Sequence, residues 1–526
     1  MHKIQIKFMF RLFLLVVLMF VVVGCSSESN VQEKNNTDKT TDTVEADEGT
    51  PKKGGEVVFA YETDVTNLDP IKGSHGNDHA FLWPIFDTLI KFSPELEPEP
   101  GLAESWDFPD DKTIVLTLRE GVTFHDGTPF DAEAVKFNIE RVNSDDSKVV
   151  DFEKIESVEV VDEKTVKLNL SEPDSSLLLA FSDRGGMMVS PTAIKESGDD
   201  FSQNPVGAGP YKMVKSVPNG EVIYEPYEDY WQEGKPYLDK MTIKIMADEN
   251  TRINALKSGE VDYAHNISPE NIPSLEKESE IVLKEIMAVP FRLLYVNASK
   301  APLDNKAVRQ AIMYGINREA LIGGITFGIG EPAYQPFPKD YWAADKDIKI
   351  AYDPEKAKQL LKEAGVDNVS FEMNHYSTAY EQKLAEAIKG QLSEIGIQVD
   401  LNAMDAAAAG ANYFTEKDAQ VLVGRWTGRP DPLMTINNLF GGDSYYNAGS
   451  YTTPEIEKLI SEAASSYDQD ELAKIYGEIS NKAVLEEAIM IPMFFTPKVA
   501  AMNTSIKGYE PNMIGKEIFS TIWKEQ

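Results

Sequence analysis

The chain has 526 residues, of which 42% are hydrophobic and 26% are charged. This length exceeds the roughly 100–200 residues of one domain, so we expect more than one domain, each with a well-formed core. The formal net charge is −35 at pH 7. A surface of that sign repels nucleic-acid phosphates, and no basic patch reverses it, so we expect no nucleic-acid partner.

The N-terminus has the pattern of an exported lipoprotein. Residues 1–11 carry three positive charges, and residues 12–23 form an unbroken apolar run. This run is too short for an ordinary spanning helix and is typical of a signal peptide. It leads into Val-Val-Gly-Cys-Ser, which contains the only cysteine of the chain, Cys25. The segment resembles a bacterial lipobox, which implies removal of residues 1–24 and lipidation of Cys25, palmitate included. An ordinary signal peptide with a chance cysteine is the alternative.

The segment after this cysteine reads as a tether. Residues 26–51 contain no aromatic residue and almost no apolar one. Such a composition cannot bury enough surface to fold, so we expect residues 25–53 to be disordered. With a lipid at Cys25, the tether would hold a folded body on the extracytoplasmic face of the cell membrane. We find no later apolar stretch long enough to cross a bilayer.

Strand patterns dominate the first part of the body. An apolar run at residues 57–60 and another at 243–245 each predict a short strand. Apolar residues alternate along 112–119, which predicts a strand with one buried face. Two further alternating segments, 157–161 and 165–170, flank a short polar turn, so they are expected to form a hairpin.

Helix patterns dominate the later part. Asp353-Pro354 and Thr453-Pro454 each combine an N-cap residue with a proline at the first helical position, so a helix should begin at both places. Apolar residues spaced four, four and three apart from Leu384 to Ile395 form one helix face, and Gly396 should end that helix. An alternating strand is predicted at 397–401. Together these patterns predict helices that cover a sheet.

Residues 120–141 carry a family resemblance. Their sequence is EGVTFHDGTPFDAEAVKFNIER, in which Asp131 should cap a helix. As a string, the segment closely resembles the signature of the family 5 extracellular solute-binding proteins, the peptide-, dipeptide- and nickel-binding components of ABC importers. The resemblance extends over residues 54–526. Further matching segments follow in the family's order, namely Asn67–Pro70, Gly101–Trp106, Pro205–Tyr211, Val296-Asn297, Pro302–Asn305 and Val308–Ala311.

The resemblance implies a fold and a division of the chain. The expected class is α/β, a two-lobed periplasmic-binding-protein-like fold with an extra subdomain in the first lobe. The chain should cross between the lobes near Pro290 and Pro497. The implied parts are lobe I at 54–82, 207–290 and 500–526, its subdomain at 83–206, and lobe II at 291–499.

The implied function is capture of a solute. The chain would be the substrate-binding component of an ABC importer, with the permease and ATPase subunits as partners, and would trap oligopeptides or dipeptides by hinge closure. We expect a monomer without a cofactor. A nickel chelate, an opine or another small anionic solute is the alternative ligand. A ligand-sensing lipoprotein without a transport role is the alternative class, and its deletion need not reduce uptake.

Catalysis is not expected. The sequence contains no G-x-S-x-G, no H-E-x-x-H and no G-x-x-x-x-G-K-[ST]. These motifs mark the commonest hydrolases, zinc peptidases and nucleotide-binding enzymes. The resemblance and the missing motifs therefore both favour a binding protein over an enzyme.

The segment from Trp426 to Pro432 falls where the family's ligand-binding loop lies. Dipeptide-binding relatives have an aspartate directly after Trp-x-Gly that holds the ligand's ammonium, whereas Arg429 follows Gly428 here. An arginine would repel an ammonium and bind a carboxylate. Asp431 would then take the ammonium, or the ligand would be reversed or anionic. Alternatively, Arg429 and Asp431 pair with each other.

Further candidates come from loops that the resemblance places beside the ligand. His375, Tyr376 and Ser377 would reach it from lobe II, and Ser74 and His75 from lobe I. Tyr446 and Asn447 are weaker candidates of the same kind. Each of these groups can equally be a solvated rim of the cleft.

His75 and His79 lie four residues apart, a spacing that places two imidazoles on one helix face and is a weak signal for a metal. No third ligand is evident in the sequence. Ordinary surface or cleft lining is the more frequent role of such a pair.

Overall fold

The computed structural model describes residues 49–73 and 76–525. Cys25, Ser74 and His75 lie outside these residues. An 11-stranded sheet is the largest in the described part of the chain. In spatial order its path is β15 (Gln398–Met404), β14 (Ser370–Tyr376), β16 (Val421–Trp426), β12 (Ile281–Val296), β17 (Met490–Asn503), β11 (Tyr263–Ala264), β1 (Glu56–Tyr61), β10 (Lys240–Ile245), β9 (Glu221–Pro226) and β8 (Tyr211–Val217), with β13 (Glu331–Pro332) beside β17.

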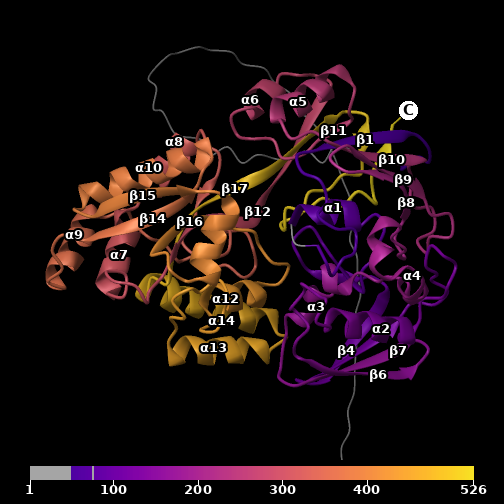
Figure 1. Cartoon of the computed structure of the whole chain (residues 1–526), viewed down its shortest axis with the longest axis horizontal. Helices are drawn as coiled ribbons and strands as arrows, with labels where there is room; N and C mark the ends of the chain where they lie inside the picture. Colours follow the sequence, from indigo (N-terminus) through magenta and orange to yellow (C-terminus); the bar gives the residue numbers. More distant parts are fainter. Residues whose placement is uncertain (1–48, 74–75, 526) are drawn as a thin grey trace, which may run out of the picture. The chain divides into compact units, whose positions relative to one another are not determined.

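Two long antiparallel strands, β12 and β17, join the two halves of this sheet (Figure 1). Their register shifts between Met287 and Phe291, and Pro290 lies inside this irregularity. Pro497 of β17 is the partner of Met287. Proline has no N–H to donate, and a bulge leaves residues unpaired and bends the strand. The ladder is therefore interrupted there, and its register shifts once more between Arg292 and Leu293.

On one side of this interruption, helices cover the strands, as the sequence predicts. β14 runs parallel to β15 and β16, and α10 connects β14 to β15. The predicted caps are present, because Asp353 accepts a hydrogen bond from the Lys356 N–H and Thr453 accepts one from the Ile456 N–H. The helices here are α7 (Lys306–Gly315), α8 (Arg318–Ile325), α9 (Pro354–Glu363), α10 (Ala379–Glu394), α11 (Ala406–Gly410), η4 (Ala411–Thr415), α12 (Pro432–Phe440), α13 (Pro454–Ala464), α14 (Gln469–Ser480) and η5 (Asn481–Glu486).

On the other side of the interruption, β1 lies between β10 and β11 and is parallel to both. Its inward side chains Val57, Phe59 and Tyr61 pack into a core with Tyr263 and Phe519. This core fixes the carboxyl end of β1, where Tyr61 meets the cleft described below. The remaining elements here are η1 (Gly76–Asp78), α1 (His79–Leu82), α5 (Glu249–Ser258), α6 (Ile272–Leu275), β18 (Ile506–Lys507) and β19 (Trp523–Lys524).

A third core belongs to a small antiparallel sheet with the order β4-β5-β7-β6. The predicted hairpin is confirmed as β6 and β7. Asp131 caps α2 by accepting from the Ala134 N–H at 2.9 Å, as predicted. The elements of this part are β2 (Ile90–Phe92), β3 (Pro98–Pro100), β4 (Ala103–Asp110), β5 (Thr113–Leu118), α2 (Ala132–Val142), β6 (Ile155–Asp162), β7 (Thr165–Leu170), α3 (Leu177–Ala180), η2 (Arg184–Gly186), α4 (Pro191–Ser197) and η3 (Gly198–Gln203).

Gly209 shows why the segment Pro205–Tyr211 is rich in glycine. Its N–H donates to the Ile85 carbonyl oxygen at 2.8 Å, which brings two backbones into direct contact. A Cβ at this position would lie 2.5 Å from the Ile85 carbonyl carbon and 2.7 Å from the Phe86 nitrogen. Both obstacles are backbone atoms, so neither can turn aside as a side chain would.

Gly209→Ala should therefore lower the free energy of unfolding by about 1–3 kcal/mol, the usual effect of overpacking a tight site. Gly323→Ala is the matched control, because Gly323 is an exposed residue of α8 with nothing within 4 Å of its Cβ position. Alanine favours a helix over glycine by up to about 1 kcal/mol, so this control should be neutral or stabilising. Urea denaturation of both variants measures the difference. Equal effects of the two substitutions would contradict the close approach at Gly209.

Candidate functional site

The site begins with an unusual pair of strand neighbours. In the register of β12 and β16, Phe291 lies opposite Trp426, and Arg292 lies opposite Arg425. Like charges directly opposite each other in a sheet are destabilising. The Glu381 carboxylate neutralises Arg292 at 2.5 Å, and the ring of Tyr380 lies 4.7 Å from the Arg292 guanidinium carbon.

A cleft cavity of about 90 Å³ lies beside this pair. Its wall combines residues from β1, the start of α1, β16, β17 and the C-terminal segment. Three cationic side chains and one carboxylate line it, and a histidine completes the set of titratable groups. The lining residues are Tyr61, Gly76, Asn77, Ala80, His265, Pro290, Arg425, Thr427, Lys498, Ile514, Gly515, Lys516 and Glu517.

Two of these cations lack a protein partner. Within residues 49–73 and 76–525, no hydrogen bond or ion pair reaches the side chain of Arg425 or that of Lys498. Burial and the nearby charge of Arg292 lower the pKa of Arg425. Burial, together with the charge of Arg425, lowers the pKa of Lys498 to about 8. Both groups therefore hold a positive charge in surroundings that oppose it.

The acids around the cavity, in contrast, are engaged. The Nδ1 of His265 lies 2.5 Å from the carboxylate of Glu62, and its Nε2 lies 3.4 Å from that of Glu517. The Tyr509 hydroxyl donates to Glu517, and the ring of Tyr61 stacks on His265 with centroids 4.0 Å apart. Burial opposes the charge of Glu62, yet the charge of His265 and its hydrogen bond lower the Glu62 pKa to about 2.

Comparison with known proteins identifies the family of the chain. The sequence profile of the bacterial extracellular solute-binding proteins, family 5, matches residues 97–447. The chain belongs to family 5 of the extracellular solute-binding proteins. The resemblance in the sequence is thus confirmed, and the protein is a solute-binding protein of an ABC importer rather than an enzyme.

The relatives bind different solutes. The glutathione-binding protein GsiB of Pectobacterium atrosepticum is 31% identical over 446 residues, which cover 81% of this chain and 86% of the relative. The periplasmic binding protein DppA of Helicobacter pylori, solved with the peptide STSA, has a TM-score of 0.79 at 26% identity, with 90% of this chain and 99% of that chain covered. NikZ of Campylobacter jejuni, solved with Ni(L-His), has a TM-score of 0.75 at 25% identity, with 88% and 97% covered. These matches confirm the predicted periplasmic-binding-protein-like α/β fold.

The predicted loop of this solute-binding protein brings together Trp426, Arg429 and Tyr446. The guanidinium carbon of Arg429 lies 5.5 Å from the Trp426 ring, and the Trp426 and Tyr446 rings meet edge to face at 5.1 Å. Burial lowers the pKa of Arg429, but Tyr446, Asp151 and Asp183 outweigh it, so the Arg429 pKa is raised. Arg429 does not line the cavity, and its binding of a ligand carboxylate stays a prediction.

The side chain of Asp431 caps a helix. Its carboxylate accepts a hydrogen bond from the Leu433 N–H at 2.7 Å and so caps α12. The structure shows no ion pair between Arg429 and Asp431, so the alternative in which they neutralise each other is wrong. Burial raises the pKa of Asp431 to about 7, although the helix N–H groups oppose the shift.

The other predicted residues of the lobe II loops are dispersed. His375 is buried in β14 with its Nδ1 3.0 Å from the Tyr376 carbonyl oxygen, and Ser377 is exposed. Asn447 is buried and donates to the Gly441 and Tyr451 carbonyl oxygens, so it holds its own loop in shape. A ligand therefore has no direct access to the side chains of His375 and Asn447 in this conformation.

Gly428 lets the backbone pack closely. Its φ is +79°, and a Cβ would lie 2.6 Å from Cγ2 of Val289 and 3.4 Å from Pro290. The close contacts at Gly428 are therefore with side chains of β12. The neighbouring residue Thr427 is exposed and lines the cavity.

The metal signal at His79 is not supported. Nδ1 of His79 lies 2.9 Å from the Gly76 carbonyl oxygen, and its Nε2 contacts Asp183 and lies 3.2 Å from Nζ of Lys516. Both ring nitrogens are thus engaged. Among the described residues, no group of three or more histidine, cysteine or acidic side chains is placed to hold a metal ion.

The sequence interpretation missed most of the cavity. Tyr61, His265, Arg425 and Lys498 come from four separate segments, and none belongs to a motif. One usable signal was present, because Arg425 is a charged residue at the end of the apolar strand β16, directly before Trp426. The charge of Arg425 in the sequence indicated a candidate site, but the other residues of the cavity wall could be identified only from the fold.

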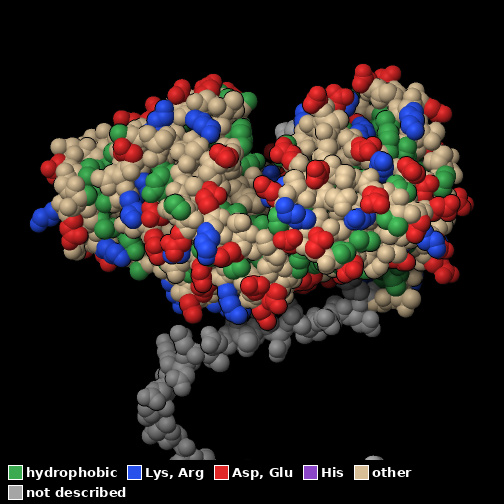
Figure 2. Space-filling view, turned by 90° about the horizontal axis from the view of Figure 1, so that it is seen from below, with side chains coloured by type: hydrophobic (Ala, Val, Ile, Leu, Met, Phe, Trp, Pro, Cys, Tyr) green, Lys and Arg blue, Asp and Glu red, His purple; other side chains and the backbone are tan. Residues whose placement is uncertain are grey.

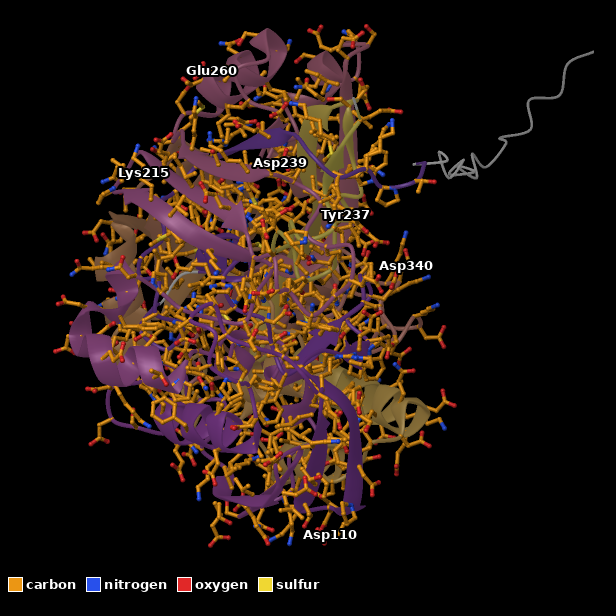
Figure 3. All side chains as sticks on the ribbon, turned by 90° about the vertical axis from the view of Figure 1, so that its right-hand side faces the viewer. Asp110, Lys215, Tyr237, Asp239, Glu260 and Asp340 are labelled. Atoms are coloured by element: carbon orange, nitrogen blue, oxygen red, sulfur yellow. The ribbon has the colours of Figure 1, made fainter. Side chains whose placement is uncertain are left out.

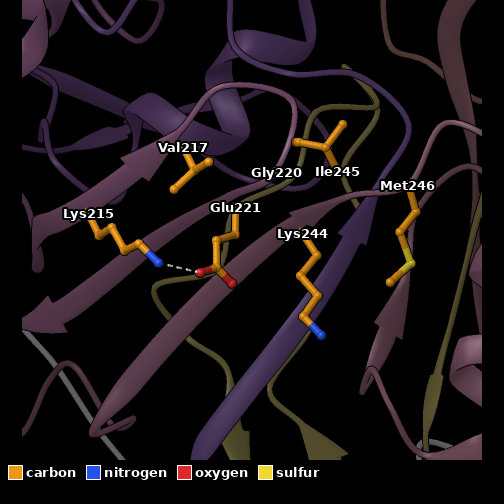
Figure 4. Close-up of a pocket in the computed structure, with 7 residues that line it drawn as sticks. All are labelled: Lys215, Val217, Gly220, Glu221, Lys244, Ile245 and Met246. Atoms are coloured by element: carbon orange, nitrogen blue, oxygen red, sulfur yellow. Dashed lines mark hydrogen bonds and ion pairs between the residues drawn. The ribbon is translucent and has the colours of Figure 1, made fainter.

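A second depression, of about 370 Å³, lies at the ends of β8 and β10 and at the start of β9 (Figure 4). Its lysines are neutralised, because Lys215 pairs with Glu221 at 2.8 Å and Lys244 with Glu260 at 3.3 Å. Figure 3 shows Lys215 and Glu260 at the periphery of the molecule. The acid-rich face in Figure 2 likewise interleaves the two signs of charge. Arg425 and Lys498 in the cleft differ from the cations of this depression and of that face, because they have no acidic partner among the described residues.

The charge state of Lys498 gives a testable prediction for stability. Below about pH 8 its ammonium is charged in both the folded and the unfolded chain, and its burial destabilises the folded form. As the pH rises from about 8 towards the ordinary lysine value near 10.4, the folded chain releases the proton first and this destabilisation disappears. Lys498→Met should therefore raise the free energy of unfolding at pH 7 by about 1–3 kcal/mol, and by clearly less at pH 10.

Urea denaturation at the two pH values measures the change. Lys389→Met is the control, because Lys389 is an exposed residue of α10. Its substitution should alter stability by less than about 0.5 kcal/mol at either pH. A Lys498→Met variant that is less stable than the parent at pH 7 would show that the lysine charge is satisfied in the folded protein.

Proposed function

We propose that the protein captures small peptide-like solutes outside the cytoplasm and delivers them to its importer by closure of two lobes. The observation that carries this proposal is the cleft cavity, whose wall joins the cationic side chains of Arg425 on β16 and Lys498 on β17 to the C-terminal segment. A peptide presents a carboxylate and unpaired backbone groups, so it suits a cleft that offers cationic side chains and strand ends.

The lobes are assigned from the cores and the crossing strands. The largest core lies almost wholly within residues 289–514, and a separate core joins β1 to the C-terminal segment. β12 and β17 pass between them, and their ladder is interrupted at Pro290 and Pro497. A few residues at the ends of elements suffice to absorb the rotation of a hinge. The proposed parts are lobe I at 54–82, 207–290 and 500–526, its subdomain at 83–206, and lobe II at 291–499.

The size of the cavity supports closure. Its volume of about 90 Å³ is below the roughly 300–1,000 Å³ of ordinary ligand pockets. A peptide therefore has to be admitted by a wider separation of the lobes, or else only one end of it enters. A ligand that contacts both lobes shifts the population towards the closed form by its differential affinity. Glutathione, the solute of the GsiB relative, is the first candidate to test.

Attachment to the membrane through Cys25 is part of the proposal. None of the helices in the described residues is long and apolar enough to cross a bilayer. A lipid at Cys25 would be followed by the polar residues 26–51, whose composition predicts a tether between membrane and body. The hydrophobic anchor of a diacylated and N-acylated cysteine is strong enough to hold such a body.

Cys25→Ser tests the anchor. In a bacterial expression host, the parent chain should fractionate with membranes and incorporate labelled palmitate, because the lipid is added to the thiol. The Cys25→Ser chain should incorporate none. Ser26→Ala serves as the control for a change beside the cysteine. Palmitate labelling that persists in Cys25→Ser would contradict lipidation at this residue.

Peptide capture is tested by calorimetric titration of residues 48–526, the compact unit that contains all the cores. Glutathione and a pool of dipeptides to pentapeptides should bind. Thr427→Trp should weaken binding at least tenfold, because Thr427 is an exposed residue of the cavity wall and an indole there fills the small volume.

Thr192→Trp is the matched control, since Thr192 is an exposed residue of α4, outside the cavity wall. It should bind as the parent does. If no peptide of the pool binds, the proposal of a peptide-like solute fails. If peptides bind and Thr427→Trp binds equally well, the site lies elsewhere than in this cleft.

A further inference from the structure

We infer that the solute is an anion whose negatively charged group binds between Arg425 and Lys498. This inference rests on the proposed function, and it selects one charge class among the peptide-like and other small solutes considered above. Three observations of the cleft carry it, namely the cation pair across two strands, the engagement of the acids, and the overall charge of the lining.

The first observation is that one arginine of the pair is left for a ligand. Arg292 and Arg425 face each other across β12 and β16, an arrangement that lowers the stability of a sheet. The Glu381 carboxylate forms an ion pair with Arg292 at 2.5 Å, whereas no group in the described part of the chain forms an ion pair or hydrogen bond with the Arg425 side chain. The cleft walls surround Arg425 and withdraw it from bulk water, yet its side chain is accessible to solvent, so a ligand can reach its planar fork of donors.

The second observation concerns Lys498, which stands on β17 beside the interruption of the ladder. Its ammonium also lacks a partner among the described residues and lines the same cavity as Arg425. A guanidinium binds a planar oxyanion through two parallel hydrogen bonds, while an ammonium acts as a point charge. Side by side, the two groups offer a carboxylate both directed hydrogen bonds and a second positive charge.

The third observation is that the described lining of the cleft offers no spare acid to a ligand ammonium. Among residues 49–73 and 76–525, Glu517 is the only carboxylate that lines the cavity, and it is occupied by His265 and Tyr509. Glu62 stands behind it, bound by His265 and by Asn77 at 3.1 Å. The third cation, Lys516, is neutralised by Asp183 at 2.9 Å. The unmatched charge of the cavity is therefore positive.

The excess of positive charge in the cavity contrasts with the acidic character of the rest of the molecule. The chain carries a formal net charge of −35, and its surface repels anions at long range. An unpaired arginine and lysine in such a protein could easily be neutralised by one of the many acids. Their separation from those acids keeps a site of opposite sign inside the cleft. An anionic group supplies the missing partner and removes the repulsion between Arg292 and Arg425.

The experiment compares ligands that differ by one charge. Residues 48–526 are titrated with glutathione and with tripeptides as free acids and as C-terminal amides, together with the non-peptide carboxylates succinate and citrate. The variants are Arg425→Gln and Lys498→Gln. We expect free acids to bind at least tenfold more tightly than their amides. Arg425→Gln should weaken the binding of the acids at least tenfold and that of the amides much less.

Lys389→Gln is the control for loss of a surface charge, because Lys389 lies on the exposed side of α10. The melting temperature of each variant, measured by thermal unfolding, shows whether the variant is still folded. Arg425→Gln should melt at the same temperature as the parent or higher, because it removes one of two facing like charges. A lower melting temperature would show that Arg425 stabilises the protein and would contradict the inference.

The outcomes separate this inference from the proposed function. If amides bind as tightly as acids, or if Arg425→Gln weakens both equally, peptide capture stands and the anionic subsite is wrong. If no peptide binds while succinate or citrate binds in a manner that depends on Arg425, the subsite stands and peptide capture is wrong. If no carboxylate of any kind binds, both are wrong.

Discussion

The antiparallel pairing of β12 with β17 is the interaction on which the rest of the structure depends. These two strands belong at once to the sheet of β1, β10 and β11 and to the sheet of β14, β15 and β16. Their register shifts between Met287 and Phe291, where Pro290 and Pro497, the partner of Met287, have no donor to offer, and it shifts again between Arg292 and Leu293. A sheet that is regular along most of its length and irregular over a short stretch concentrates bending there. The cleft residues Arg425 and Lys498 stand on strands next to this place, so any bending there alters the distance between the cavity walls.

The electrostatics of the cleft follow from the same arrangement. Because β16 pairs with β12, the side chains at the end of β16 have a fixed position relative to Arg292, and Arg425 cannot move away from it without breaking the ladder. Glu381, at the start of α10, neutralises the charge of Arg292 through an ion pair. The charge of Arg425 has no such partner among the described residues. Proteins retain such local destabilisation mainly at functional sites, where a ligand or a reaction uses it.

Local signals in the sequence were sufficient for many of the elements. The caps at Asp131, Asp353 and Thr453 act as predicted, because a capping side chain depends only on residues two or three positions away. The hairpin of β6 and β7 follows from alternation and a polar turn in the same way. The family motifs supplied the fold class, which propensity and periodicity alone left at helices covering a sheet.

The cavity was beyond such reasoning, and the loop at Trp426 shows why. The motif directed attention to Arg429, yet the charge that lines the cavity is Arg425, whose position depends on a strand register with β12. The sequence predicts Asp431 as a ligand group or a partner of Arg429, but in the structure it caps α12, a role consistent with its place directly before Pro432. Sequence neighbours are separated by the fold, and distant residues are brought together.

Relatives of this protein share its fold but bind different solutes. A family that binds glutathione, peptides and a nickel–histidine complex on one fold must obtain its selectivity from a few side chains at the cleft rather than from the scaffold. Under the proposed function, the scaffold would contribute the hinge, and the described lining contributes an excess of positive charge inside an acidic molecule. Replacing an arginine or lysine of that lining is then expected to change the charge of the accepted solute without changing the fold. A shared fold therefore leaves the solute undetermined, whereas the proposed anionic subsite would restrict the solute to one charge class.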